Sequence, residues 1–157
     1  MDPEHFERKL RDFMTSAGIK GEQLYFQGSV HTVEQAAKEL NARPSDLVKS
    51  VVLLYGGQVL VAIVSGDDRA SPLKVGKALG SPPPRMATAR EVLKYTGYPA
   101  GGVPPFGYEA KVVIDSRVMD KAVVYGGGGS ERSLLRIATA ELSRATAAIV
   151  ADVRETS

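Results

Sequence analysis

The stretch Val-Lys-Ser-Val-Val-Leu-Leu-Tyr-Gly-Gly-Gln-Val-Leu-Val-Ala-Ile-Val, residues 48–64, predicts a β-hairpin at the centre of the fold. Both arms, 48–55 and 59–64, are nearly continuous runs of apolar residues, a pattern typical of strands that are buried on both faces. Gly56 and Gly57 between them form a two-residue hairpin signal. The exception to the apolar pattern is Lys49 with Ser50, near the start of the first strand.

Helices are expected on the amino-terminal side of this hairpin. Apolar residues recur at spacings of three and four within residues 3–17, which predicts an amphipathic helix that Gly18 ends. Thr32 stands three residues before Gln35, the capping-box pattern that opens a helix. Residues 33–40 then supply the apolar face of that second helix.

Short helices and strands alternate irregularly on the carboxyl-terminal side of the hairpin. The expected helices lie at 71–79, from Thr88 onward and from a Thr139 cap to 145, and the expected strands at 111–115, 122–125, 134–137 and 148–153. Several of these strands are expected to pair as antiparallel hairpins, and the sequence has no regular strand–helix repeat. The sequence therefore predicts an α+β domain with a mixed, barrel-like β-sheet surrounded by short helices.

One segment resembles a cloning remnant. Residues 22–28, Glu-Gln-Leu-Tyr-Phe-Gln-Gly, differ by one residue from a protease cleavage site that is common in expression tags. Such remnants have to be excluded from fold reasoning. Leu24, Phe26 and their neighbours are typical of a native strand, so we keep the segment as part of the fold.

Composition excludes several classes of function. The chain has 157 residues, 43% of them hydrophobic and 24% charged, which suits one compact domain. It has no cysteine, and its two histidines, His5 and His31, lie far apart in sequence. Disulfides, thiolate zinc sites and a cysteine nucleophile are excluded, and a histidine-rich metal centre or a Ser-His-Asp triad is hard to build. We expect no metal and no cofactor.

The net charge and hydropathy of the chain indicate which partners and which compartment to expect. The net charge of +2 is a mild positive bias that permits contact with a polyanion, although a non-specific nucleic-acid binder would be far more basic. No apolar stretch approaches the ~20 residues of a membrane helix. The charged amino terminus does not resemble a signal peptide. The cytoplasm is the expected location, with no membrane contact.

Lys49 is the first candidate for a functional side chain. A lysine within an otherwise apolar strand is costly to bury unless its charge meets a partner. It either points to solvent at the edge of the sheet or places a cation inside a cleft, where it would suit a phosphate or a polarised carbonyl.

The loop of residues 97–107, Gly-Tyr-Pro-Ala-Gly-Gly-Val-Pro-Pro-Phe-Gly, is the second candidate. Glycines allow backbone N–H groups to approach a ligand closely, and prolines stiffen the loop around them. Such donors can stabilise an oxyanion, each contributing ~3 kcal/mol. Composition alone favours the alternative, a rigid connector that binds nothing.

The sequence leaves the roles of two further features undecided. The run Gly126–Gly129 lacks the pattern of a phosphate-binding P-loop or of a dinucleotide fold, so it is either a flexible hairpin tip or a loop that lines the same cleft. Asp115 ends a strand, where it is either a turn residue and helix cap or a catalytic group.

Taken together and in order, these elements resemble the YbaK/ProX family of aminoacyl-tRNA deacylases, the prolyl-tRNA synthetase editing-domain family. The resemblance covers roughly residues 22–153 and is most specific in the glycine–proline loop. The matching segments are Thr32 to Ala37, Val48 to Val51, Val59 to Val64 with Gly66-Asp67, Thr96 to Tyr98, Gly101 to Gly107, Val113 to Asp115, and the glycine run before Leu134 to Ile137. Residues 1–18 are then a helical extension and residues 19–157 a single editing domain.

The resemblance implies a barrel-like sheet surrounded by helices and hydrolysis of the ester between a wrong, small amino acid and the terminal ribose of tRNA. It makes Lys49 the pocket lysine, with Gly101 and Gly102 as catalytic backbone donors. Family members are thought to lack a protein nucleophile, and the ribose hydroxyl of the tRNA helps to place or activate water. The residues expected to bind substrate are Ser50, Val103, Pro104, Phe106, Asp115, Gly127 and Gly128.

Ser50 departs from the family pattern, in which threonine or asparagine follows the lysine. The asparagine branch favours alanine and the threonine branch favours cysteine, so alanine, cysteine, serine or threonine could be the residue removed. The expected partner is the acceptor end of an aminoacyl-tRNA, with a synthetase that delivers it as a further possibility. Two alternatives stay open: a non-catalytic tRNA- or nucleotide-binding module of the same fold, and a small-molecule esterase. Oligomeric state is not predicted.

Overall fold

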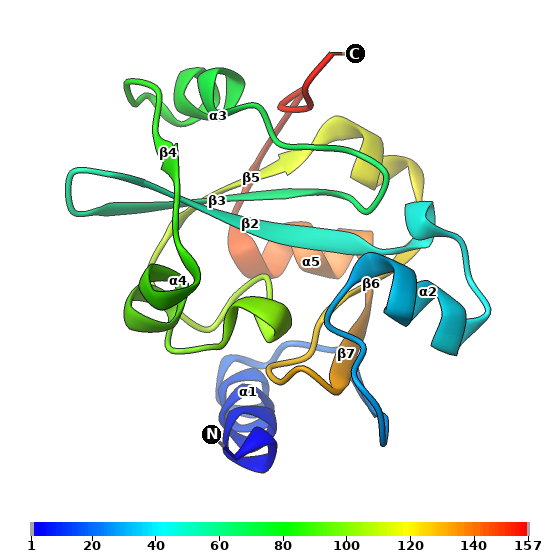
Figure 1. Cartoon of the computed structure of the whole chain (residues 1–157). Coiled ribbons are helices and arrows are strands. Elements are labelled where there is room, and N and C mark those ends of the chain that lie inside the picture. Colours follow the sequence, from blue (N-terminus) through cyan, green and yellow to red (C-terminus); the bar gives the residue numbers. More distant parts are fainter. Residues whose placement is uncertain (1, 157) are drawn as a thin grey trace.

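The computed structural model describes residues 2–156 and shows an α+β architecture, as the sequence predicts (Figure 1). The α-helices are α1 (Pro3–Ala17), α2 (Val33–Leu40), α3 (Pro72–Leu79), α4 (Ala89–Thr96) and α5 (Thr139–Thr146). The strands are β1 (Glu22–Tyr25), β2 (Val48–Tyr55), β3 (Gln58–Ser65), β4 (Arg85–Met86), β5 (Lys111–Asp115), β6 (Val123–Gly127), β7 (Ser133–Ala138) and β8 (Ile149–Ala151). Short 3₁₀ turns lie at Pro44–Asp46, Ala100–Gly102 and Ser116–Asp120.

The strands form two sheets. A mixed five-stranded sheet has the order β4-β2-β3-β5-β8, with β3, β5 and β8 parallel, and an antiparallel three-stranded sheet has the order β1-β7-β6. A parallel bridge between Leu47 and Tyr125 links the two sheets. The predicted barrel-like sheet is thus divided into two sheets that meet at the start of β2, and this junction is where the candidate site lies.

The β2–β3 hairpin occupies the centre of the larger sheet, as predicted. Tyr55 pairs with Gln58 across the Gly56-Gly57 turn. Helix α3 covers one face of the hairpin, and α5 and α1 lie on the other side (Figure 1). Separate apolar cores fill the two sides, which explains why both arms are apolar throughout.

The amino-terminal helix is integrated into this fold. Its Phe6, Leu10 and Met14 belong to the same core as residues of β2, β3 and β5. Glu7, on the same helix, is buried and accepts hydrogen bonds from the Ser130 hydroxyl (2.6 Å) and from Arg132 (3.2 Å). These contacts join α1 to the loop that follows β6.

The N-cap residues explain where most helices begin. Thr32 and Thr88 each accept a hydrogen bond from the backbone three residues on and complete a capping box. Thr139 differs from expectation: the cap position of α5 is Ala138, and the Thr139 hydroxyl donates instead to the carbonyl of Lys121 (2.6 Å). That bond fastens the start of α5 to the turn before β6.

None of the helices found in residues 2–156 is both long and apolar enough to cross a lipid bilayer.

Candidate functional site

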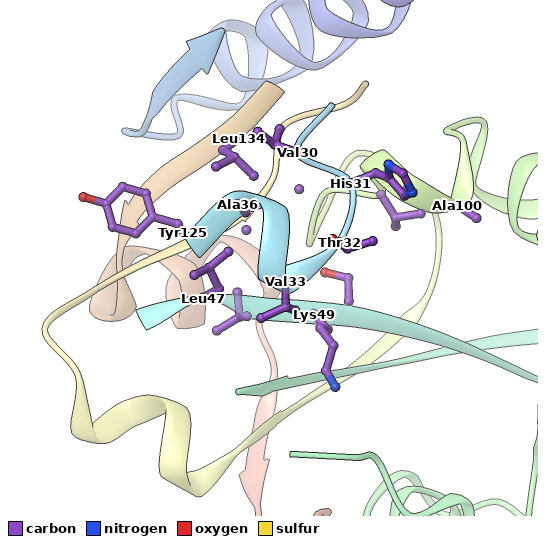
Figure 2. Close-up of a pocket in the computed structure, with 16 residues that line it drawn as sticks. Val30, His31, Thr32, Val33, Ala36, Leu47, Lys49, Ala100, Tyr125 and Leu134 are labelled. Atoms are coloured by element: carbon purple, nitrogen blue, oxygen red, sulfur yellow. The ribbon is translucent and has the colours of Figure 1, made fainter. Parts of the chain in front are cut away.

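The candidate site is a cavity of about 310 Å³ at the junction of the two sheets. Its walls come from five segments that are distant in sequence: residues 30–36 with the start of α2, residues 47–50 at the start of β2, residues 100–103 with their 3₁₀ turn, residues 125–127 of β6, and Leu134 of β7. Figure 2 shows Val30, Ala36, Leu47 and Leu134 grouped on one side of this space. They form an apolar floor with no charged side chain.

Glycines allow the walls to approach one another closely. A Cβ atom on Gly101 would lie 2.7 Å from the Cβ of His31, and one on Gly102 would lie 2.6 Å from the backbone of Ser130. A Cβ atom on Gly127 would fall within the carbonyl group of Val103, 2.6 Å from its carbon. The glycine–proline loop and the late glycine run therefore pack backbone against backbone, an approach that only glycine permits.

The two predicted backbone donors, Gly101 and Gly102, differ in whether the fold already uses their N–H groups. The Gly102 N–H donates to the carbonyl of Pro99 (2.9 Å), and the Gly102 carbonyl accepts from Gly129 (2.9 Å). Both groups are used within the fold, and Gly102 does not line the cavity. Gly101 does line it, and no acceptor within residues 2–156 takes its N–H. Gly101 is thus the backbone donor that the turn leaves available.

Lys49 and Ser50 lie on opposite faces of β2. Side chains alternate along a strand, and Val48 and Val52 pack in the core on the cavity side, whereas Leu53 packs in the core beneath α3. Ser50 therefore shares the cavity face, and its hydroxyl has no hydrogen-bond partner in the part of the chain that the structure describes. In Figure 2 the Lys49 side chain extends away from Val30, Ala36 and Leu134.

The Lys49 ammonium is half-buried at the edge of the cavity. It donates to the carbonyl of Asp68, and its stem also borders a second cavity of about 400 Å³ with Arg69 on the α3 side of the sheet. Burial lowers the pKa of Lys49, the positive charge of Arg69 lowers it further, and the carboxylates of Asp68 and Glu34 act in the opposite direction. The folded protein thus disfavours the charge of Lys49.

Three predicted substrate-binding residues lie within the loops rather than on the cavity surface. Phe106 is buried and stacks on Phe13 of α1, with ring centroids 6.1 Å apart. The carbonyl of Pro104 accepts from the Tyr108 hydroxyl (2.6 Å). Gly128 packs against the backbone of β7, where its N–H donates to Ser133 (3.2 Å). These residues shape the loops, whereas Val103 and Gly127 reach the cavity itself.

Asp115 lies away from the cavity and is completely buried. Its carboxylate accepts hydrogen bonds from the backbone of Val153 (2.8 Å) and Arg117 (3.1 Å) and from the guanidinium of Arg154 (2.7 Å). The bond from Asp115 also raises the pKa of Arg154. The structure thus places Asp115 where it joins the end of β5 to the carboxyl-terminal segment.

We expect Asp115→Asn to lower the free energy of unfolding by about 2 kcal/mol, because the amide nitrogen would face at least one of the three donors that the buried carboxylate now satisfies. Urea denaturation measures this effect, and Asp120→Asn, on an exposed side chain of the next turn, is the matched control. A substrate-binding role for Asp115 would instead appear as unchanged stability with reduced turnover.

The structure adds residues that the sequence did not single out for the site. His31, Thr32 and Val33 line the cavity, together with Ala100 and Gly126 from the two glycine-rich candidate loops. The Thr32–Gln35 capping box was visible in the sequence, but nothing there placed it opposite the loop of Gly101. No group of three or more histidine and carboxylate side chains in residues 2–156 is arranged to hold a metal ion.

Comparison with known proteins identifies relatives of this chain. The aminoacyl-tRNA editing domain family matches residues 27–145. The uncharacterised protein YwhH of Bacillus subtilis is 30% identical over 139 residues, which cover 87% of this chain and 88% of YwhH. The proline–tRNA ligase of Bacillus licheniformis is 29% identical over 90% of this chain, which spans a quarter of that ligase.

Solved structures of similar proteins agree with the match to the aminoacyl-tRNA editing domain family. The structure of a proposed trans-editing enzyme for prolyl-tRNA synthetase superimposes with a TM-score of 0.89 at 30% identity, covering 99% of both chains. A hypothetical protein superimposes with a TM-score of 0.86 at 37% identity, covering 94% of this chain and 99% of its own.

Proposed function

Because this chain belongs to the aminoacyl-tRNA editing domain family, we propose that it hydrolyses the ester between a small, wrong amino acid and the terminal ribose of a tRNA. The observation that carries the proposal is the cavity of about 310 Å³, where the free N–H of Gly101 and the hydroxyl of Ser50 stand beside an apolar floor. The cavity thus combines a donor for a developing oxyanion with space for a small side chain.

The chemistry requires little from the protein, because an aminoacyl ester is already activated. Water attacks the carbonyl carbon, the Gly101 N–H stabilises the resulting oxyanion, and the bond to the ribose oxygen then breaks. The proton from the attacking water passes to the departing ribose oxygen, which leaves a free amino acid and an intact tRNA. The neighbouring ribose hydroxyl helps to place the water. No metal, cofactor or protein nucleophile takes part in this scheme.

In this proposal Lys49 binds the phosphate of the terminal nucleotide. Its ammonium is held by one neutral carbonyl, that of Asp68, so an incoming phosphate offers it a charged partner instead. Four rotatable bonds allow the side chain to turn from the α3 side of β2 towards the rim of the cavity. The phosphate contact would hold the ester against Gly101.

The apolar floor selects the amino acid by size and charge in this account. Val30, Ala36, Leu47 and Leu134 offer no partner to a charged side chain, and a bulky one would not fit. Ser50 supplies a hydroxyl at the same surface, so alanine, cysteine, serine and threonine are the candidates. Relatives that are proline–tRNA ligases make tRNA(Pro) the first tRNA to test.

A panel of purified tRNAs tests the proposal. We expect release of free amino acid from at least one of Ala-, Cys-, Ser- and Thr-tRNA(Pro), undiminished by a chelator, and recovery of a tRNA that can be charged again. Binding of these RNAs without turnover would favour a non-catalytic module. Turnover of short esters without turnover of any aminoacyl-tRNA would favour a small-molecule esterase.

A further inference from the structure

His31 lies at the mouth of the cavity and has no part in the chemistry described above. Its side chain is exposed, and it directly precedes Thr32, the N-cap residue of α2. Gly101 packs directly against this side chain, since a Cβ atom on Gly101 would be 2.7 Å from the Cβ and 3.2 Å from the Cγ of His31. In Figure 2 the imidazole lies beside Ala100, directed away from Val30 and Leu134 on the cavity floor.

Hydrogen bonds fix one edge of the imidazole. Nδ1 of His31 contacts the hydroxyl of Ser29, and that hydroxyl donates to the side-chain carbonyl of Gln35 (3.2 Å). The hydroxyl of Ser29 thus joins the imidazole to the side chain of Gln35. Gln35 is itself held by the Thr32 capping box. The ring is therefore oriented before any ligand arrives, and in residues 2–156 Nε2 has no partner.

The size of the cavity determines which part of a substrate reaches His31. About 310 Å³ is near the lower end of the ~300–1,000 Å³ typical of small-molecule sites. In the function proposed above, the aminoacyl group and the ribose would fill the space between Gly101 and the floor. The adenine of the terminal nucleoside, which every tRNA carries, then has to lie outside, at the mouth.

We propose that His31 is a stacking platform for the terminal adenine of the aminoacyl-tRNA, an inference that rests on the function proposed above. Aromatic side chains, histidine among them, recognise unpaired RNA bases by stacking. Because Gly101 has no side chain, its backbone can lie against the Cβ and Cγ of His31, and the exposed part of the imidazole stays open to a base. The contact to Ser29 reduces the loss of ring freedom on binding. His31 thus positions the nucleoside while Gly101 acts on the ester.

Binding measurements test this proposal without requiring turnover. The probe is an RNA hairpin that carries alanine on its 3′-terminal adenosine through a hydrolysis-resistant amide, compared with the same RNA whose terminal ribose lacks its base. Since each stacked base contributes ~1–3 kcal/mol, we expect His31→Ala to weaken binding of the adenine RNA by about tenfold. His31→Phe should restore binding to within about threefold of wild type, because the ring stacks without a hydrogen bond.

Two controls and two contrary outcomes complete the test. His5→Ala, at the other exposed histidine, should leave both affinities unchanged. The abasic RNA should bind wild type and His31→Ala equally. Equal weakening for both RNAs, or rescue by His31→Gln rather than His31→Phe, would overturn the stacking role. An ester-linked RNA that is bound with this contrast but never hydrolysed would reject the proposed function and leave the role of His31 intact.

Discussion

Gly127→Ala is expected to lower the free energy of unfolding by at least about 3 kcal/mol, at the upper end of what an added methyl group costs in a packed interior. The new Cβ would lie within the carbonyl group of Val103 and 3.1 Å from the carbonyl carbon of Gly102. Both obstacles are backbone, so no side chain can turn aside. Either β6 or the glycine–proline loop has to move, and both line the cavity.

Thermal unfolding measures the loss of stability, and a deacylation assay measures the effect of the displaced cavity walls on activity. A loss of about 3 kcal/mol corresponds to roughly 6–12 °C in Tm for a chain of this size. Gly57→Ala is the matched control, because a Cβ atom there meets nothing within 4 Å. We expect that variant to keep its stability and its activity. A Gly127→Ala protein that is as stable and as active as wild type would show that the two loops do not need this close approach.

Lys49→Ala is expected to reduce kcat/KM for a mischarged tRNA by about 100-fold, the scale of one charge-assisted contact, about 2.7 kcal/mol. Stability should change little. Burial and the charge of Arg69 lower the pKa of Lys49, so the folded state disfavours its ammonium, and removal of the charge relieves that cost. An activity loss would therefore come from lost substrate contact and not from unfolding.

Lys38→Ala on the exposed side of α2 is the control for a general loss of positive charge near the tRNA. Rates of amino acid release from both variants, at concentrations below KM, give the comparison. If Lys49→Ala hydrolysed every mischarged tRNA at the wild-type rate, Lys49 would have no role in binding the substrate.

Much of the fold can be predicted from local patterns, because the relevant physics is local. The Gly56-Gly57 turn, the Thr32 and Thr88 caps and the Gly18 stop each act within a few residues, and each lies where expected. The division into two sheets could not be predicted in this way. It depends on the pairing of β1 with β7, more than 100 residues apart.

The orientation of the Lys49 side chain could not be predicted from the sequence. An alternating strand reveals which side chains share a face, but β2 is apolar on both faces, so its pattern carries no such information. Lys49 and Ser50 both border the cavity, but neighbouring residues on a strand point in opposite directions, so the Lys49 side chain lies at its edge. Only the packing of Val52 and Leu53 against different cores decides that Ser50 faces the cavity.

The roles of Asp115 and Gly102 could not be predicted from the sequence either. Asp115 could be recognised as a strand-end carboxylate, but its partner Arg154 lies 39 residues further on. The N–H of Gly102 was expected to be free, and a short 3₁₀ turn directs it to Pro99 instead. In both cases the residue type was informative, and the partner that determines its role became visible only in three dimensions.

The most direct test of the account is a competition between esters on one tRNA. Wild-type protein is mixed with tRNA(Pro) carrying alanine, cysteine, serine or threonine, and with correctly charged Pro-tRNA(Pro), and the release of each amino acid is followed. We expect at least one small wrong amino acid to be released at least tenfold faster than proline, as differences of one or a few methylenes allow. Release of none of them above the spontaneous rate, or release of all five at one rate, would contradict the account.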